Sequence, residues 1–137
     1  MRKYFFFTFK PEVAFNLTTI VLRISAALML LHGWPKLMKF SEKAEAFSDP
    51  LGIGHTGSLA LTVFAEFFCT ILIVLGCCTR VATIPLMFLM GIIIFVVHTT
   101  DPFPDKELAW HYLLLYLAIF FLGPGKYSVD RQILKAA

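Results

Sequence analysis

The sequence predicts an all-α protein, a bundle of four transmembrane helices, and three observations lead to this fold class. Hydrophobic residues make up 58% of the 137 residues and charged residues only 15%, against about 45–50% and about 25% in soluble domains. A soluble core of this length cannot bury so much apolar surface. Four apolar stretches approach the length that crosses about 30 Å of hydrocarbon, and no strand-like alternation is present. The composition excludes an ordinary soluble enzyme and a disordered protein.

The four expected spans belong to a single integral membrane domain over residues 1–137. They cover about residues 14–34, 58–76, 81–98 and 107–123. The first span carries Arg23 and is too long for a cleaved signal peptide, so we expect it to remain as an anchor. Pro85 falls in the first turn of the third span, where its missing N–H costs least. Asp101-Pro102 ends the third span and Gly123-Pro124 the fourth, because the residue before a proline avoids the helical conformation.

The distribution of Lys and Arg predicts that both termini lie in the cytoplasm. One side of the membrane receives seven cations: Arg2, Lys3, Lys10, Arg80, Lys126, Arg131 and Lys135. The other side receives four: Lys36, Lys39, Lys43 and Lys106. Because the more basic side is cytoplasmic, all four histidines and six of the nine acidic residues are expected on the outer side. The Tyr4–Phe7 run is expected to form an aromatic belt at headgroup level.

Two charged residues, Arg23 and Glu66, are expected deep inside the bilayer. They lie on antiparallel spans, about 13 Å and about 12 Å from opposite membrane surfaces, so both side chains are predicted to reach the midplane. A lone charge there costs several kcal/mol, and such residues face one another or a wet cavity. We therefore predict an Arg23–Glu66 ion pair. The pair is either purely structural, fixing which helices pack together, or it forms the floor of a ligand pocket.

A second layer of polar residues is expected at the outer ends of the spans. It consists of His32, Trp34, Lys36, His98, Glu107 and His111. With Arg23 and Glu66, these residues form the predicted ligand-binding or buried polar site. Neutral histidines beside carboxylates suit proton transfer at physiological pH. Trp34, Trp110 and Phe103 are candidate walls for an apolar slot that accepts a quinone.

Helical phase sets a condition on a single pocket. On an ideal helix His32 lies about 180° from Arg23, so the two share a pocket only if Gly33 and Pro35 distort the first span. Residues 41–57 are expected to form a short surface helix over the outer mouth, with a flexible return at residues 51–54. That segment is a candidate lid or partner-docking edge.

No metal site is predicted and no catalytic residue is assigned. Histidines and Glu107 are ligand types, yet they come from separate helices and no H-E-x-x-H spacing is present. Cys69 is expected to pack mid-span as a small core residue. Cys77-Cys78 lies at the cytoplasmic end of the second span, where thiols stay reduced, and the pair lacks the C-x-x-C spacing of a redox motif. Its role is either interfacial packing or palmitoylation, and we assign it no redox chemistry.

Several of these elements occur together in a fixed order. They are Arg23, His32-Gly33-Trp34-Pro35-Lys36, Glu66, Leu75-Gly76-Cys77-Cys78-Thr79-Arg80, His98 and Gly123-Pro124-Gly125-Lys126-Tyr127-Ser128-Val129-Asp130. In this order the chain from about Leu22 to Leu134 resembles the DoxX family of small four-span bacterial membrane proteins. Each element alone is weak evidence, and the ordered set is strong. Aliphatic or aromatic residues are more usual in that family at the positions of Cys77 and Cys78, so nothing carries over to them.

The resemblance implies a multi-pass protein of the bacterial inner membrane. The family takes its name from a subunit of a thiosulfate:quinone oxidoreductase, and relatives are linked to quinone resistance, thiol stress and membrane-associated oxidoreductase complexes. We predict a component of a membrane oxidoreductase system that binds a quinone or similar lipophilic ligand. The alternatives are a non-catalytic membrane scaffold for redox partners and a small transporter or proton pathway acting as an oligomer.

Partners follow from composition and from the absence of cofactor motifs in the sequence. No flavin, haem or iron–sulfur motif is present, so no intrinsic cofactor is expected, and a partner or a bound quinone must supply the electrons. The expected partners are the lipid bilayer and a redox-enzyme subunit or a second copy of the chain. The net charge of +3 forms no basic stripe with interleaved aromatics, so no nucleic acid is expected.

Overall fold

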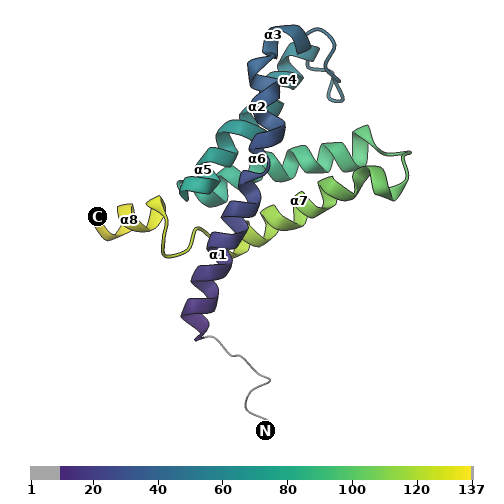
Figure 1. Ribbon diagram of the computed structural model, residues 1–137. Helices are drawn as coiled ribbons and strands as arrows, with labels where there is room; N and C mark the ends of the chain where they lie inside the picture. The colour runs from purple at the N-terminus through teal and green to yellow at the C-terminus, as the bar shows by residue number, and fades with distance from the viewer. Residues whose placement is uncertain (1–9, 137) are drawn as a thin grey trace.

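The computed structural model describes residues 10–136, and over this range the chain is helical, with turns and loops but no strand (Figure 1). The elements are α1 (Pro11–Ala27), α2 (Leu30–Met38), α3 (Phe40–Lys43), α4 (His55–Val63), η2 (Phe64–Cys69), α5 (Thr70–Leu75), α6 (Thr79–Ile92), η3 (Ile93–Val97), α7 (Phe103–Leu122) and α8 (Val129–Ala136). The all-α prediction is confirmed. The predictions for Arg2, Lys3 and Tyr4–Phe7 lie outside the described residues.

Within residues 10–136, three continuous helical segments are long and apolar enough to cross a membrane: Pro11–Met38, His55–Leu75 and Thr79–Val97. The expected fourth span, α7, differs from them because Asp105, Lys106 and Glu107 lie near its start. The uncharged remainder of about 15 residues is roughly 22 Å long at 1.5 Å per residue, less than the thickness of the hydrocarbon. The structure therefore has three clear candidate membrane helices.

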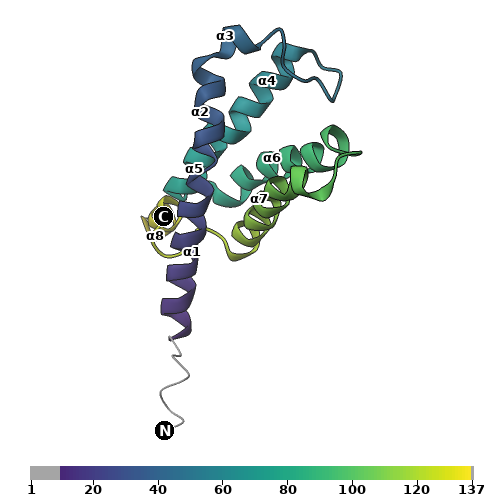
Figure 2. The same ribbon diagram turned by 45° about the vertical axis from the view of Figure 1, so that its right-hand side comes forward.

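The helices form two diverging pairs. The first pair is α1–α2 against α4–η2–α5, and the second is α6–η3 against α7, which pack along their lengths. Figure 2 shows the second pair diverging from α2 and α4, so that the loop between η3 and α7 is at its far end. At the opposite end the pairs converge, because α1 packs on both α5 and α7. This divergence opens a cleft between α4–η2 and α6–η3.

The first membrane helix is distorted, although not where the sequence suggests. Regular α-helix stops at Ala27 and resumes at Leu30, with tighter i→i−3 hydrogen bonds at Leu28 (3.2 Å) and Met29 (3.0 Å). Bonds of this type close a 3₁₀-like turn that changes the phase of the following residues. The distortion thus precedes Gly33 and Pro35 by about one helical turn.

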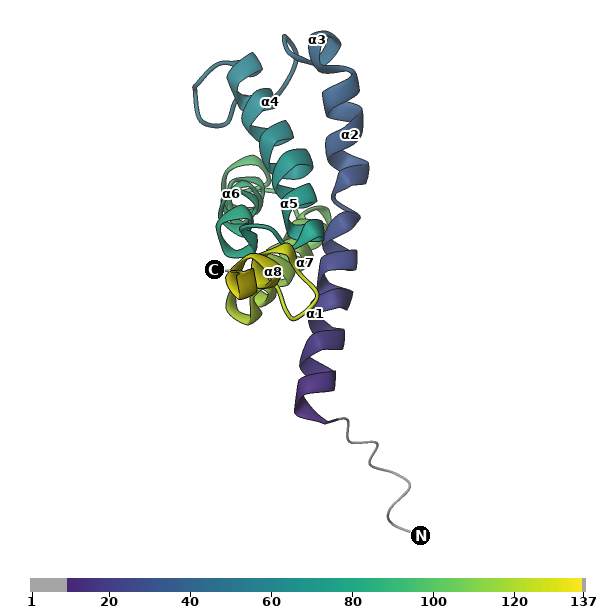
Figure 3. The same cartoon turned by 90° about the vertical axis from the view of Figure 1, so that its left-hand side faces the viewer.

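The segment after α7 folds back across the converging end of the bundle, where α8 lies beside the α5–α6 turn (Figure 3). Gly125 adopts φ +79° and lies so close to Thr19 that a Cβ atom would overlap the threonine side chain. The Lys126 N–H donates to the Asn16 side chain (3.3 Å), and the Asp130 N–H donates to the Gly76 carbonyl (2.9 Å). These contacts attach the C-terminal segment to α1 and α5.

Candidate functional site

The main cavity is the cleft between the diverging helix pairs, with a volume of about 470 Å³. One wall comes from α4 and η2, including Leu61 and Phe64, and the other from α6 and η3, including Phe88 and Ile92. Residues 47–53 of the loop between α3 and α4 contribute to the same cleft. The lining is almost wholly apolar, so the cleft suits a lipophilic molecule.

The charged part of the cleft is an ion pair between Lys36 and Glu66. The Lys36 Nζ lies 2.6 Å from both carboxylate oxygens of Glu66. The Glu66 side chain is 4% exposed and that of Lys36 is 23% exposed. Both residues line the cleft, so they form its charged wall.

Gly33 explains how α2 approaches Glu66 closely enough for this pair. A Cβ atom at Gly33 would lie 2.8 Å from the Glu66 carbonyl carbon and 2.9 Å from its oxygen, so any larger residue would push the helices apart. Lys36 follows Gly33 by three residues and therefore lies on the same face of α2. Glu66 itself sits in η2, a π-helical segment, and such segments are often found at functional sites.

The predicted Arg23–Glu66 pair is wrong, because Arg23 lies at the converging end of the bundle. Its Nε donates to the carbonyls of Ile73 (3.1 Å) and Val74 (3.2 Å), and its Nη2 to Val74 (2.5 Å). Its Nη1 donates to the carbonyl of Tyr127 at 2.6 Å. The first span was expected over about residues 14–34 and the second over 58–76, but the helices run over Pro11–Met38, 28 residues, and His55–Leu75, 21 residues. Their register places Lys36 opposite Glu66.

The predicted polar residues at the outer ends do not converge on the cleft. His32 is exposed and lies edge-on to Tyr112, with ring centroids 6.2 Å apart. Trp34 is exposed and packs on Phe67, with ring centroids 5.8 Å apart. Neither His32 nor Trp34 lines the cleft, which takes only Lys36 and Glu66 from the predicted site.

The remaining predicted site residues lie on the loop between η3 and α7 and on α7 itself. The His98 Nδ1 is 2.7 Å from an Asp101 carboxylate oxygen, and the Lys106 ammonium donates to the His98 carbonyl at 3.0 Å. Glu107 and His111 are exposed, and the His111 ring nitrogen lies 2.9 Å from the Glu107 carbonyl oxygen. These contacts stabilise the local turn and the start of α7, outside the cleft.

The aromatic walls also differ from the prediction. Trp34, Trp110 and Phe103 do not line the cleft, whereas Phe47, Phe64 and Phe88 do. Nothing in the sequence separates these phenylalanines from the other 12, because only the angle between the helix pairs selects them.

Sequence reasoning also missed a buried polar cluster formed by Thr70, Tyr112 and Tyr116. The two tyrosine rings stack at 6.0 Å, and Thr70 and Tyr116 are both fully buried. Among residues 10–136, the Thr70 Oγ1 and the Tyr116 hydroxyl have no hydrogen-bond partner. A buried unpaired hydroxyl is costly, and this cluster is a polar part of an otherwise apolar core.

Asp49 fixes the loop that borders the cleft. Its carboxylate accepts hydrogen bonds from the Ser58 hydroxyl (2.6 Å), the Gly54 N–H (2.8 Å) and the Ile53 N–H (3.0 Å). The Ser58 hydrogen bond in particular lowers the pKa of Asp49 below its ordinary value. The expected surface helix is limited to α3, and the rest of the segment is a loop held by this carboxylate.

The sequence matches a known protein family. The sequence profile of the DoxX family matches residues 18–99, more than half of the chain. The chain belongs to the DoxX family. No curated protein and no solved structure matches this DoxX chain. The matched region includes Arg23, Lys36 and Glu66, and it ends before the C-terminal segment that supplies Tyr127 to Arg23.

The DoxX elements in this chain separate into two clusters. The Gly33–Lys36 segment and Glu66 build the charged wall of the cleft. Arg23 instead joins α1 to the end of α5 and to the C-terminal segment. The cleft is therefore the candidate ligand site of this DoxX protein, and Arg23 has a structural role.

Proposed function

We propose that this DoxX protein is a component of a membrane oxidoreductase system that binds a quinone or a similar lipophilic ligand in the cleft. One observation carries the proposal: a buried Lys36–Glu66 ion pair faces an apolar cavity of about 470 Å³. This volume lies within the range of about 300–1,000 Å³ for small-molecule sites. An intramembrane ion pair at such a cavity is a functional candidate by default.

The ion pair has unused capacity to bind a ligand. An ammonium group has three N–H donors, and two of those of Lys36 are directed at Glu66. The third is available to a ligand carbonyl oxygen, and Glu66 is placed to exchange a proton with the ligand. The apolar walls would hold the ring and the start of an isoprenoid chain. A bound quinone is the only cofactor in this proposal, and a redox-enzyme subunit supplies the electrons.

In the proposed membrane setting, α7 is the fourth span of a single domain in the bacterial inner membrane. Its aromatic-rich body packs along α6, and its charged first turn lies at the outer surface. Both termini are then cytoplasmic, in agreement with the distribution of Lys and Arg. The cleft opens near the outer leaflet, since Lys36 lies toward the outer end of the first span. Of the eight predicted site residues, Lys36 and Glu66 would then contact the ligand in the cleft, and the other six would be structural or surface residues.

A non-catalytic scaffold for redox partners is the second candidate. It is favoured by the dispersal of His32, His98 and His111, which lie outside the cleft. In that case the Lys36–Glu66 pair only fixes the packing of α2 on η2. A transport pathway requires an oligomer, so the mass of the purified particle would distinguish a transporter from the other two candidate functions.

Mass spectrometry of organic extracts from the gently purified protein tests the proposal. We expect a stoichiometric lipophilic molecule in the wild type and its loss in Glu66→Gln. Glu107→Gln is the matched control, because it neutralises an exposed acid outside the cleft. Retention of the ligand in Glu66→Gln, or no ligand in any sample, contradicts the proposal, and the second result favours the scaffold.

A further inference from the structure

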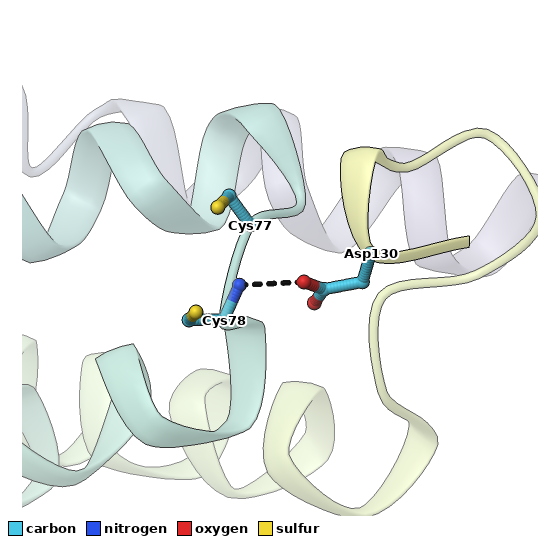
Figure 4. Close-up of side chains that lie close together, drawn as sticks. All are labelled: Cys77, Cys78 and Asp130. Atoms are coloured by element: carbon cyan, nitrogen blue, oxygen red, sulfur yellow. Dashed lines mark hydrogen bonds between the residues drawn. The ribbon is translucent and has the colours of Figure 1, made fainter. Parts of the chain in front are cut away.

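Cys77 and Cys78 lie beside Asp130 at the converging end of the bundle, although Asp130 comes 52 residues after Cys78 in the sequence. The cysteines occupy the turn between α5 and α6, and Asp130 is in the first turn of α8. The two sulfur atoms and a carboxylate oxygen all lie within 4.8 Å of one another. Figure 4 shows Asp130 reaching from α8 to the turn that carries both thiols.

The position of Asp130 is fixed by its hydrogen bonds to the start of α6. Its Oδ1 accepts from the Cys78 N–H (2.7 Å), and its Oδ2 accepts from the Thr79 N–H (3.1 Å) and hydroxyl (3.2 Å). A carboxylate oxygen has two lone pairs. Oδ1 therefore has one lone pair left for a further partner while it holds the turn in place.

The backbone of the turn takes an unusual conformation at two positions. Gly76 and Cys78 both have positive φ, +72° and +47°, and the Gly76 carbonyl accepts the Asp130 N–H. Cys78 is exposed and Cys77 half-buried, so a solute reaches the sulfur atoms from outside the bundle. The fold thus gathers the three ligand groups at an accessible place.

We propose that Cys77, Cys78 and Asp130 bind one thiophilic divalent cation, with Zn²⁺ as the representative ion. Two thiolates and a carboxylate form a donor set that zinc accepts, and three protein ligands leave one position for water. On binding, each thiol loses its proton to solvent, so two protons leave for each cation and no change of oxidation state occurs. The cation would join the α5–α6 turn to α8.

The observed spacing is close to what such an ion needs. Zinc–sulfur bonds are about 2.3 Å and zinc–oxygen bonds about 2.0–2.2 Å, so two sulfur ligands of one tetrahedral ion lie about 3.8 Å apart. The atoms here lie within 4.8 Å. The separation that one tetrahedral ion needs lies inside this limit.

The site formed by Cys77, Cys78 and Asp130 is separate from the cleft, so it does not depend on which ligand the cleft binds. It lies beside the carbonyl groups that hold Arg23, since Gly76 and Ser128 adjoin both features. A cation there would stabilise the C-terminal segment that supplies the Tyr127 carbonyl to Arg23.

Cadmium titration of the full-length protein in detergent provides the first test, with the thiolate-to-cadmium absorption band as the readout. We expect saturation at one Cd²⁺ per chain, with competition by Zn²⁺. Cys77→Ser and Cys78→Ser should each weaken binding by at least tenfold. Asp130→Asn should weaken it severalfold, because an amide oxygen still accepts the hydrogen bond from one side of the turn, whereas the amide NH2 accepts none and the negative charge is lost.

Cys69→Ser is the matched control, because Cys69 is a buried thiol outside the cluster. The proposal is overturned if the wild type gives no band, if Cys78→Ser keeps it, or if Cys69→Ser loses it equally. If a variant does not fold, maleimide labelling of Cys78 in the wild type decides the question. Protection by saturating Zn²⁺ supports the site, and unchanged labelling refutes it.

Discussion

Arg23 and the Lys36–Glu66 pair show two different ways of placing charge inside a membrane protein. Arg23 donates to the main-chain carbonyls of Ile73, Val74, Pro124 and Tyr127, and nearly all of its five N–H donors are used. Lys36 and Glu66 neutralise one another beside a cavity and keep a free donor. The comparison teaches that an intramembrane charge indicates a ligand site only where its hydrogen-bonding capacity is incompletely used.

The location of each charge explains the difference. Arg23 lies where α5 ends, and the last carbonyl groups of a helix have no partner within the helix. These groups also carry the negative end of the helix dipole, so a guanidinium satisfies them without a carboxylate. Glu66 lies inside a continuous helical segment, where backbone groups are already paired, and it needs a cationic side chain instead.

The largest expected effect is the loss of stability in Arg23→Met. Hydrogen bonds to charged groups contribute about 1.5–3 kcal/mol each, and four carbonyls lose their partner, so we expect destabilisation by about 5 kcal/mol or more. Thermal unfolding in detergent measures it. Arg80→Met is the control, because Arg80 is exposed and makes one long hydrogen bond of 3.5 Å to Phe121. Similar melting temperatures for the two variants would contradict the structural role of Arg23.

Lys36→Met should have the next largest effect. It leaves the Glu66 carboxylate buried without a partner, which costs about 3 kcal/mol or more. The double variant Lys36→Met/Glu66→Met should be milder than Lys36→Met alone, since no charge remains unpaired. Both variants should lose the ligand. Additive losses of stability in the double variant would show that the pair is not coupled.

Filling the cleft should affect ligand binding without a large effect on stability. Leu61→Trp places a bulky side chain in the cleft wall, and we expect ligand occupancy to fall about tenfold. Leu114→Trp on α7 is the matched control, because Leu114 is exposed to a similar extent, 59% against 55%, and does not line the cleft. Equal occupancy in the two variants would exclude the cleft as the ligand site. Extracted ligand per chain is the measurement.

The smallest expected effect concerns the loop held by Asp49. Its pKa is lowered in the folded protein, so the loop is stabilised above the unfolded-state value of about 3.9. This contribution is lost as the pH falls through the lower folded-state pKa. Asp49→Asn should modestly increase the proteolysis of residues 44–54 at neutral pH. When the pH is lowered, the rate of proteolysis should change less in this variant than in the wild type. Wild-type cleavage that does not respond to acid would contradict this role.

Particular residues show how far sequence reasoning extends. The apolar stretches predicted the helices, and the ordered motif predicted the family. The motif also contained both partners of the cleft ion pair, Lys36 and Glu66, but the partner chosen for Glu66 was wrong. The error arose because the register of two antiparallel helices depends on where each helix begins and ends. Composition alone does not fix those positions. Gly33 was the available signal, since a glycine within an apolar helix marks a close approach of another backbone.

The sequence by itself determined that this protein consists of apolar helices suited to a membrane and that it belongs to the DoxX family, because hydrophobicity and the ordered motif can both be read along the chain. Only the tertiary structure decided which charges meet, which phenylalanines line a cavity, and that Asp130 joins Cys77 and Cys78 more than 50 residues away. These outcomes depend on the angle between two helix pairs and on the path of the segment after α7. Both are set by the packing of many side chains at once, and no local pattern records them.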